Sequence, residues 1–267
     1  MIHERIYLNE AKTAYLDSYA VTLDEECAKD AILVIPGGGY AGVCNGREGE
    51  RIALAFAARG VNAFSLTYSV GEDVRFPCQL LEAARAVAYI KENAAKYCIK
   101  PDRIFATGFS AGGHLLGTLS TLSSLAEREL ELPDGAVRLA GLVYCYPVIS
   151  AKYNTHGGSF ANLLKKPLSE YTEEEKNLLS VEHNVSETTP PAFIWHTATD
   201  QIVPVQNSLL LAKAYADAGV PFCAHIYPQG PHGVALGTRT TYVGRDDFIN
   251  PEASEWVDKA CEWMKNI

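Results

Sequence analysis

Gly108-Phe109-Ser110-Ala111-Gly112 is a G-x-S-x-G pentapeptide that lies between a short apolar run, 103–107, and a helix-like stretch, 113–119. A strand that turns directly into a helix forces the serine at the turn into strained backbone angles, and glycines on either side let the chains pass. The turn also places the amide groups next to Ser110 at a helix N-terminus, which favours a negative charge. The stretch therefore predicts a nucleophilic serine, with a chance Gly/Ser turn as the alternative.

Apolar runs alternate with amphipathic stretches from about residue 31 onward, which is the pattern of parallel strands joined by crossover helices. Two earlier segments, 6–8 and 15–23, alternate like antiparallel strands that open the sheet. We therefore predict a single α/β domain over 1–267, with a mostly parallel central sheet and helices on both faces. The predicted strands span 31–35, 62–68, 103–107, 139–146, 192–197 and 221–227, and the predicted helices span 47–59, 79–97, 110–125, 205–218 and 251–266.

Residues 150–190 interrupt this alternation. They are polar, they include His156-Gly157-Gly158 and the acidic run Glu173-Glu174-Glu175, and they contain no clear strand. An insertion between strands is where a lid or a substrate cap would lie. We expect a small inserted cap at about 150–190, and a solvated helical excursion without a substrate role is the alternative.

The composition is that of an ordinary globular protein, with 48% hydrophobic and 21% charged residues. The formal net charge of −9 argues against binding to nucleic acid, which depends on clustered lysine and arginine, and favours a neutral or weakly charged small-molecule substrate. The N-terminal residues lack a basic start before an apolar run, and no stretch approaches the roughly 18 apolar residues of a membrane helix. We therefore expect a cytoplasmic protein without a membrane partner.

Seven cysteines are scattered along the chain, and none is in C-x-x-C spacing. This arrangement predicts neither a disulfide framework nor a zinc site, and we expect most of the cysteines to be buried as small apolar residues. Cys44, which stands near a glycine-rich loop, is the one that could contact a ligand. The seven are Cys27, Cys44, Cys78, Cys98, Cys145, Cys223 and Cys261.

A serine hydroxyl is a weak nucleophile, so it needs a base within hydrogen-bond reach and a carboxylate that orients the base. In a sheet of this kind the acid follows a late strand and the histidine follows the last strand. Asp200 stands just after the apolar run 192–197, and His232 lies in the glycine- and proline-rich stretch 228–233. We therefore predict a catalytic triad of Ser110, Asp200 and His232. The alternatives are a helix cap for Asp200 and a solvated turn histidine for His232.

Other histidines fit the role of the base less well. We expect His114, on the helix after the serine, to be packed and bonded to a loop. His196 and Asp200 could also be metal ligands, but no third ligand follows at a recognisable spacing, and we predict no metal and no cofactor. Three further histidines lie inside a predicted strand or far from the strand ends, namely His3, His183 and His225.

A second glycine-rich loop, Pro36-Gly37-Gly38-Gly39-Tyr40, follows the apolar run 32–35. Consecutive glycines let the backbone approach a substrate and turn its amide groups inward. Such donors stabilise the oxyanion of a tetrahedral intermediate, and one donor is typically worth about 3 kcal/mol of the barrier. We predict an oxyanion hole formed by the amides of Gly38, Gly39 and Ala111. The alternative is a phosphate-binding loop, although the G-x-G-x-x-G and G-x-x-x-x-G-K-S patterns are absent.

Together these motifs make the chain resemble the α/β-hydrolase superfamily over nearly its whole length. Within it, the sequence is similar to the small bacterial esterases related to acetyl xylan and feruloyl esterases, and more distantly to the hormone-sensitive-lipase group and kynurenine formamidase. The hormone-sensitive-lipase group usually has histidine before the glycine triplet, where this chain has Pro36. The motifs that carry the resemblance are 34–40, 108–115, 200–204 and 231–233.

The resemblance implies an α/β-hydrolase fold and a cofactor-free serine esterase. The implied substrates are short acyl esters, in particular acetyl esters of sugars or xylo-oligosaccharides. An amidase, an arylformamidase or a peptidase of the same fold would use the same parts and stays an alternative. A non-catalytic binding protein on a hydrolase fold is a further alternative, although such proteins usually lack a triad residue. A homo-oligomer is compatible with the sequence.

Overall fold

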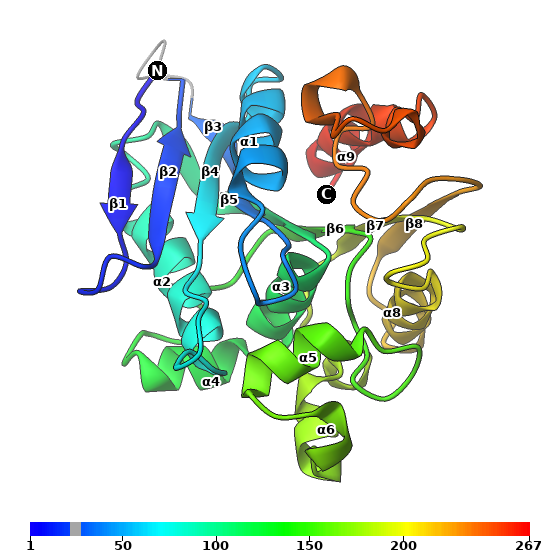
Figure 1. Cartoon of the computed structure of the whole chain (residues 1–267). Coiled ribbons are helices and arrows are strands. Elements are labelled where there is room, and N and C mark those ends of the chain that lie inside the picture. Colours follow the sequence, from blue (N-terminus) through cyan, green and yellow to red (C-terminus); the bar gives the residue numbers. More distant parts are fainter. Residues whose placement is uncertain (22–27) are drawn as a thin grey trace.

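The computed structural model describes residues 1–21 and 28–267, and it is built on a twisted sheet with helices on both faces (Figure 1). In these residues the sheet has eight strands in the order β1-β2-β4-β3-β5-β6-β7-β8. The pairs β1–β2 and β2–β4 are antiparallel, and the rest of the sheet is parallel. The predicted α/β architecture is confirmed. The strands are β1 (Arg5–Tyr7), β2 (Tyr15–Tyr19), β3 (Lys29–Ile35), β4 (Asn62–Thr67), β5 (Ile99–Phe109), β6 (Gly141–Cys145), β7 (Ala192–Thr197) and β8 (Phe222–Tyr227).

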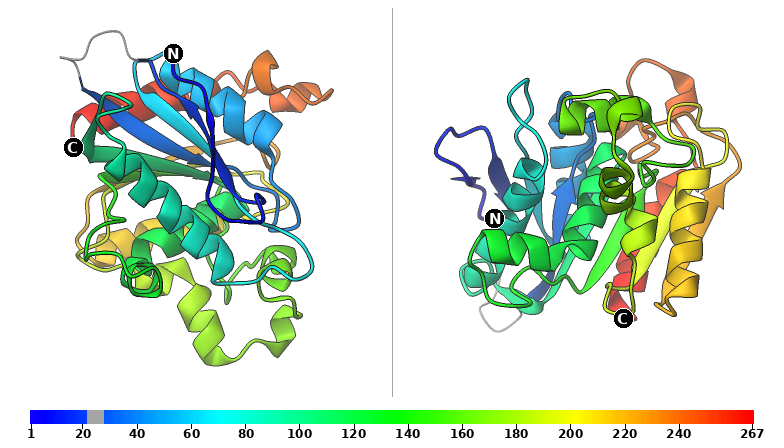
Figure 2. Two further views of the ribbon diagram at one scale, coloured as in Figure 1. Left: turned by 90° about the vertical axis from the view of Figure 1, so that its left-hand side faces the viewer. Right: turned by 90° about the horizontal axis from the view of Figure 1, so that it is seen from below.

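Helices join the parallel strands and cover the sheet (Figure 2). In the described residues they are α1 (Glu50–Ala57), α2 (Cys78–Glu92), α3 (Ala111–Thr121), α4 (Ser123–Glu129), α5 (Gly157–Leu164), α6 (Glu173–Leu179), α7 (Val181–Asn184), α8 (Gln206–Asp217) and α9 (Trp256–Lys265). The buried side chains of α1 and α9 pack on one face of the sheet, and those of α2, α3 and α8 pack on the other. The core is therefore divided into two apolar layers by the sheet.

The two layers follow from the alternation of side chains along each strand. On β3, Leu33 and Ile35 belong to the apolar cluster under α2 and α3, whereas Ile32 and Val34 belong to the cluster under α1 and α9. All four side chains are fully buried. Because both faces of the strand are covered, the strand is a continuous apolar run, which made it recognisable as a parallel strand from sequence.

Some predicted elements have different ends in the structure. β5 begins at Ile99, several residues before the predicted start at 103. The predicted helix 47–59 is a separate helical turn, Asn45–Gly49, followed by α1. The predicted helix 110–125 is broken at Leu122 into α3 and α4. Just before this break, two side-chain hydroxyls donate to the Gly117 carbonyl, which competes with the helical backbone bonds.

The chain ends also differ from the prediction. β2 ends at Tyr19, and Ala20 then forms a single antiparallel bridge with Ile2. The last part of the predicted strand 15–23 extends into positions 22 and 23, which lie outside the described residues, as does Cys27. The predicted helix 251–266 becomes α9 only after a short 3-10 turn. Over 1–21 and 28–267, no helix combines the length and the apolar character that crossing a bilayer requires.

Residues 150–190 form a helical segment between β6 and β7 that contains α5, α6 and α7 (Figure 1). Its acidic run lies in the first turn of α6, where negative charge is favourable. Thr172 and Glu175 form a capping box at this end of the helix. On α5, Asn162 Nδ2 donates to the Gly39 carbonyl at 2.9 Å. The segment thus contacts the glycine-rich loop, and its role as a substrate cap stays a prediction.

His114 connects this segment to the core. It is fully buried on α3. Its Nε2 lies 2.8 Å from the Leu179 carbonyl oxygen, so this nitrogen donates, and its Nδ1 lies 2.8 Å from the hydroxyl of Tyr40, which donates to it. His114 is therefore packed and bonded to the glycine-rich loop, as the sequence predicts, and its two hydrogen bonds fit a neutral side chain.

We expect His114 to make the folded protein lose stability as the pH falls from 7 to 5. Burial lowers the pKa of His114 to about 4, against a bond to the Leu179 carbonyl that raises it. An unfolded histidine titrates near about 6.5. The unfolded chain therefore binds a proton in this window while the folded chain does not, and folding stability falls as pH falls. The loss from this one group is about 2 kcal/mol at pH 5.

Urea unfolding of the wild type and His114→Gln at pH 7 and pH 5 checks this expectation. Glutamine can make the same two hydrogen bonds but does not titrate. The wild type should lose about 2 kcal/mol more than the variant between the two pH values. Equal losses in both proteins would show that His114 does not cause the pH dependence.

Candidate active site

Ser110 occupies the turn between β5 and α3. Its backbone angles, φ 52° and ψ −119°, lie in a region that residues other than glycine rarely adopt. A Cβ atom on Gly108 would lie 2.5 Å from the carbonyl oxygen of Gly112, and one on Gly112 would collide with the backbone of Ile35 and Pro36. The turn is therefore strained and requires glycine at positions 108 and 112, as the pentapeptide predicts.

The three residues of the predicted triad meet at the carboxyl ends of the strands. His232 Nε2 lies 2.8 Å from Ser110 Oγ, and His232 Nδ1 lies 2.6 Å from Asp200 Oδ2. With its proton on Nδ1, His232 donates to Asp200 and accepts from the Ser110 hydroxyl. Ser110 and Asp200 are buried, whereas 17% of the His232 side chain is exposed. The histidine is therefore the most exposed of the three residues.

Asp200 follows β7 and is held by four hydrogen bonds. Its Oδ1 accepts the N–H groups of Ile202 at 2.9 Å and Val203 at 3.0 Å, and its Oδ2 accepts from His196 and His232. Burial alone would raise the pKa of the carboxyl, but the bonds from the two histidines hold the pKa of Asp200 well below its ordinary value. Asp200 is therefore ionised at neutral pH. The helix-cap alternative is wrong, because α8 begins without a side-chain cap.

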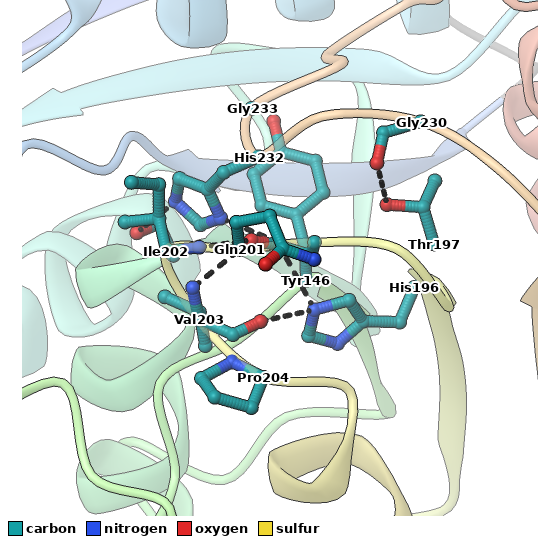
Figure 3. A network of polar contacts seen from close by, with 12 residues as sticks. Tyr146, His196, Thr197, Gln201, Ile202, Val203, Pro204, Gly230, His232 and Gly233 are labelled. Atoms are coloured by element: carbon teal, nitrogen blue, oxygen red, sulfur yellow. Dashed lines mark hydrogen bonds and ion pairs between the residues drawn. The ribbon is translucent and has the colours of Figure 1, made fainter.

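His196 is a second histidine on the same carboxylate. It is fully buried, and its Nε2 lies 3.2 Å from Asp200 Oδ2 and 3.0 Å from the Val203 carbonyl oxygen (Figure 3). Both partners only accept, so Nε2 carries the proton. Its Nδ1 lies 2.7 Å from Ser208 Oγ. His196 thus fixes the acid in place, whereas the sequence suggested it only as a metal ligand. Within the described residues, no group of three or more side chains could hold a metal ion.

The histidine loop, residues 228–235, is anchored before His232, and the His232 ring is packed against an aromatic side chain. Before His232, Thr197 Oγ1 donates to the Gly230 carbonyl at 2.9 Å (Figure 3). The ring of Tyr146 contacts the ring of His232 edge to face, with centroids 5.2 Å apart and planes at 74°. The imidazole is therefore held by packing as well as by its bond to Asp200.

The predicted oxyanion residues lie on two segments next to Ser110. Ala111 begins α3, and Gly38 and Gly39 belong to the glycine loop, residues 37–40. Gly38 and Gly39 have φ values of 135° and 63°, which suit glycine. In the part of the chain that the structure describes, none of these three N–H groups donates to another residue. Their role as an oxyanion hole stays a prediction.

His156 is a residue near the site whose role could not be predicted from the sequence. It stands at the start of α5, and its Nδ1 lies 2.8 Å from Ser159 Oγ. Burial lowers the pKa of His156, and the neighbouring His232 lowers it further. The start of α5 therefore lies within electrostatic reach of the triad. In the sequence, the only indication of such a role is that His156 lies in the polar segment 150–190.

The cysteines are less buried than predicted. Among the described ones, only Cys145 and Cys261 are buried, and none forms a disulfide. Cys223 is half-buried because it lies on β8 at the edge of the sheet. Cys44 is exposed, and its contact with a ligand stays a prediction.

Two sequence comparisons bear on the family. The family model described as BD-FAE matches residues 16–215. Endo-1,4-beta-xylanase B of Butyrivibrio fibrisolvens is 36% identical over 90% of this chain and 38% of its own length. Acetylxylan esterase of Xylanibacter ruminicola is 31% identical over 88% of this chain and 46% of its own length. The chain thus spans less than half the length of these two curated relatives.

The fold is shared with solved structures. The crystal structure of an acetyl ester-xyloside bifunctional hydrolase from Caldicellulosiruptor lactoaceticus has a TM-score of 0.83 and 34% sequence identity. The match covers 98% of this chain and 96% of that one. The expected α/β-hydrolase fold is therefore confirmed. From the family match and this likeness over nearly the whole length, it follows that the chain belongs to the BD-FAE family of α/β hydrolases.

Proposed function

We propose that the chain is a carboxylic ester hydrolase in which Ser110 is the nucleophile, His232 is the general base and Asp200 orients the base. The observation that carries this proposal is the continuous chain of hydrogen bonds from Ser110 Oγ through both nitrogens of His232 to Asp200. The names of the relatives support the reaction class, because they include an acetylxylan esterase and an acetyl ester-xyloside hydrolase.

In the first half of the proposed reaction, Ser110 Oγ attacks the ester carbonyl carbon while His232 Nε2 takes the hydroxyl proton. The carbonyl oxygen becomes an oxyanion. When the tetrahedral intermediate collapses, the bond to the alcohol oxygen breaks and His232 gives its proton to that oxygen. The ionised Asp200 stabilises the imidazolium that exists between these two transfers.

In the second half, a water molecule attacks the carbonyl carbon of the acyl group on Ser110 while His232 takes a proton from the water. Collapse breaks the bond to Ser110 Oγ, which receives the proton back from His232, and the carboxylic acid leaves. We assign the amides of Gly38, Gly39 and Ala111 to the oxyanion of both intermediates. The absence of other acceptors for these N–H groups among the described residues supports this assignment.

For the substrate we propose short acyl esters, in particular acetyl esters of sugars or xylo-oligosaccharides. The relatives named above support this class through what their names say of them. The net charge of −9 is consistent with a neutral substrate. We also propose that residues 150–190 form a cap over the substrate site, because Asn162 on α5 is bonded to Gly39 of the glycine loop.

The proposal predicts a preference for short acyl chains and for esters. We expect kcat/KM of the purified protein to fall from p-nitrophenyl acetate through butyrate to octanoate, and acetate to be released from acetylated xylo-oligosaccharides. An N-formyl anilide is the matched amide substrate. Faster cleavage of the anilide than of the acetyl ester would contradict the esterase assignment in favour of an amidase.

A further inference from the structure

Glu48 is a buried carboxylate that the triad does not use. It is 3% exposed and lies in the helical turn Asn45–Gly49. Its Oε2 accepts the N–H of Gly37 at 2.9 Å, and its Oε1 accepts the hydroxyl of Tyr146 at 2.8 Å. Arg47 lies 3.5 Å from the same Oε1. A buried carboxylate is costly to desolvate, and an apolar side chain could fill the same space, so stability alone does not account for it.

The contact with Gly37 acts on the glycine loop. A Cβ atom on Gly37 would lie 2.9 Å from Ser110 Cβ, so this residue packs directly against the proposed nucleophile. Gly38 and Gly39, whose amides we assign to the oxyanion, follow it immediately. The bond to Glu48 holds the peptide plane of the Gly37 N–H, and the Cys44 N–H, which donates to the Gly37 carbonyl at 2.9 Å, holds the next plane, which carries the Gly38 N–H.

The contact with Tyr146 acts on the histidine loop. The Tyr146 hydroxyl donates to Glu48 and accepts the N–H of Ala235 at 3.1 Å, and its ring packs against the ring of His232. Arg47 Nη2 donates to the carbonyl of Gly233 in the same loop. The Arg47-Glu48 pair is thus bonded to both loops that flank Ser110.

We propose that Glu48 is a positioning residue that fixes the position of the glycine loop relative to the histidine loop. This role rests on the proposed function. The N–H of Gly37 and the guanidinium of Arg47 can only donate, and they face different oxygens of Glu48, so two acceptor oxygens are required. Only a carboxylate supplies them. A glutamine would turn an NH₂ group toward one of the two donors and release one of the loops.

Glu48→Gln is therefore the informative variant. We expect kcat for p-nitrophenyl acetate to fall by about 10- to 100-fold, because small displacements of catalytic groups have effects of this size. KM should change little, because the substrate ground state does not need the oxyanion donors. The affinity for a trifluoromethyl ketone, which forms a tetrahedral adduct with a nucleophilic serine, should fall in parallel with kcat/KM.

Glu82→Gln is the matched control. Glu82 is also buried, at 1% exposure, and it accepts the N–H of Ser69 at 2.7 Å, but its bonds do not reach the triad or either loop. Its replacement should leave kcat unchanged even if it lowers stability. Tyr146→Phe is a second test that keeps the Glu48 charge, and it should also lower kcat because the link to Ala235 is lost.

The outcomes separate this inference from the proposed function. The role of Glu48 is contradicted if the wild type hydrolyses esters, Ser110→Ala does not, and both Glu48→Gln and Tyr146→Phe keep the kcat of Glu82→Gln. It is also contradicted if kcat falls without a parallel loss of ketone affinity. A wild type without esterase activity, or an active Ser110→Ala, overturns the proposed function and this role with it.

Discussion

Replacing Ser110 with alanine should lower kcat for p-nitrophenyl acetate by at least about 1,000-fold, because the acyl-enzyme can no longer form. The Ser110 hydroxyl is bonded to His232 Nε2 in the folded chain, and its loss removes the nucleophile without disturbing the bond between His232 and Asp200. Initial rates at saturating substrate measure the effect. The remaining rate would come from the oxyanion amides and from substrate binding, both of which the substitution leaves in place.

Ser120→Ala is the control for this experiment. Ser120 is a partly buried serine further along α3, and its hydroxyl donates to the Gly117 carbonyl at 2.9 Å. Its replacement should leave kcat close to that of the wild type. An equal loss in both variants would point to damage of α3, and retained turnover in Ser110→Ala would remove Ser110 from the mechanism.

Asp200→Asn should lower kcat by about 1,000- to 10,000-fold while the fold is kept. Asp200 Oδ1 accepts two backbone N–H groups, so the asparagine oxygen will take that position and its NH₂ group will face His232. His232 Nδ1 must then accept, which moves the ring proton to Nε2. In that tautomer, Nε2 cannot take the proton of Ser110.

Asp217→Asn is the matched control for this substitution, because Asp217 is an exposed carboxylate at the end of α8 that pairs only with Lys213 in the described residues. It should retain full activity. Circular dichroism of both variants checks that the fold is intact. A kcat for Asp200→Asn within tenfold of the wild type would contradict the assigned role of Asp200.

The meeting of the three residues of the proposed triad could be predicted from sequence because each of them follows a recognisable strand. Ser110 follows β5 in a glycine-flanked turn, Asp200 follows β7, and His232 follows β8. β7 and the end of β5 are buried on both faces and form continuous apolar runs, so their ends are visible in the sequence, whereas β8 is a partly exposed edge strand that is bounded by the glycine- and proline-rich stretch 228–233. Parallel strands bring these ends to one edge of the sheet, which is why residues far apart in the chain could be placed together.

The residues that support the triad could not be predicted in this way. Glu48 is bonded to Tyr146, which is 98 residues away, and nothing in the local sequence marks either one as buried next to the other. His196 stands inside an apolar strand, and its bond to Asp200 depends on how the chain turns back after β7. Near the end of α3, hydroxyl groups bond to the backbone within one turn, which helical periodicity does not reveal.

Labelling with a fluorophosphonate, followed by intact-mass and peptide mass spectrometry, tests most directly whether Ser110 is an activated nucleophile. The reagent reacts with a serine whose hydroxyl proton is taken by a neighbouring base. We predict one adduct per chain, located on the peptide that contains Ser110, no adduct in Ser110→Ala, and much slower labelling in Asp200→Asn. An adduct on another residue, or equal labelling of the wild type and Ser110→Ala, would contradict the account.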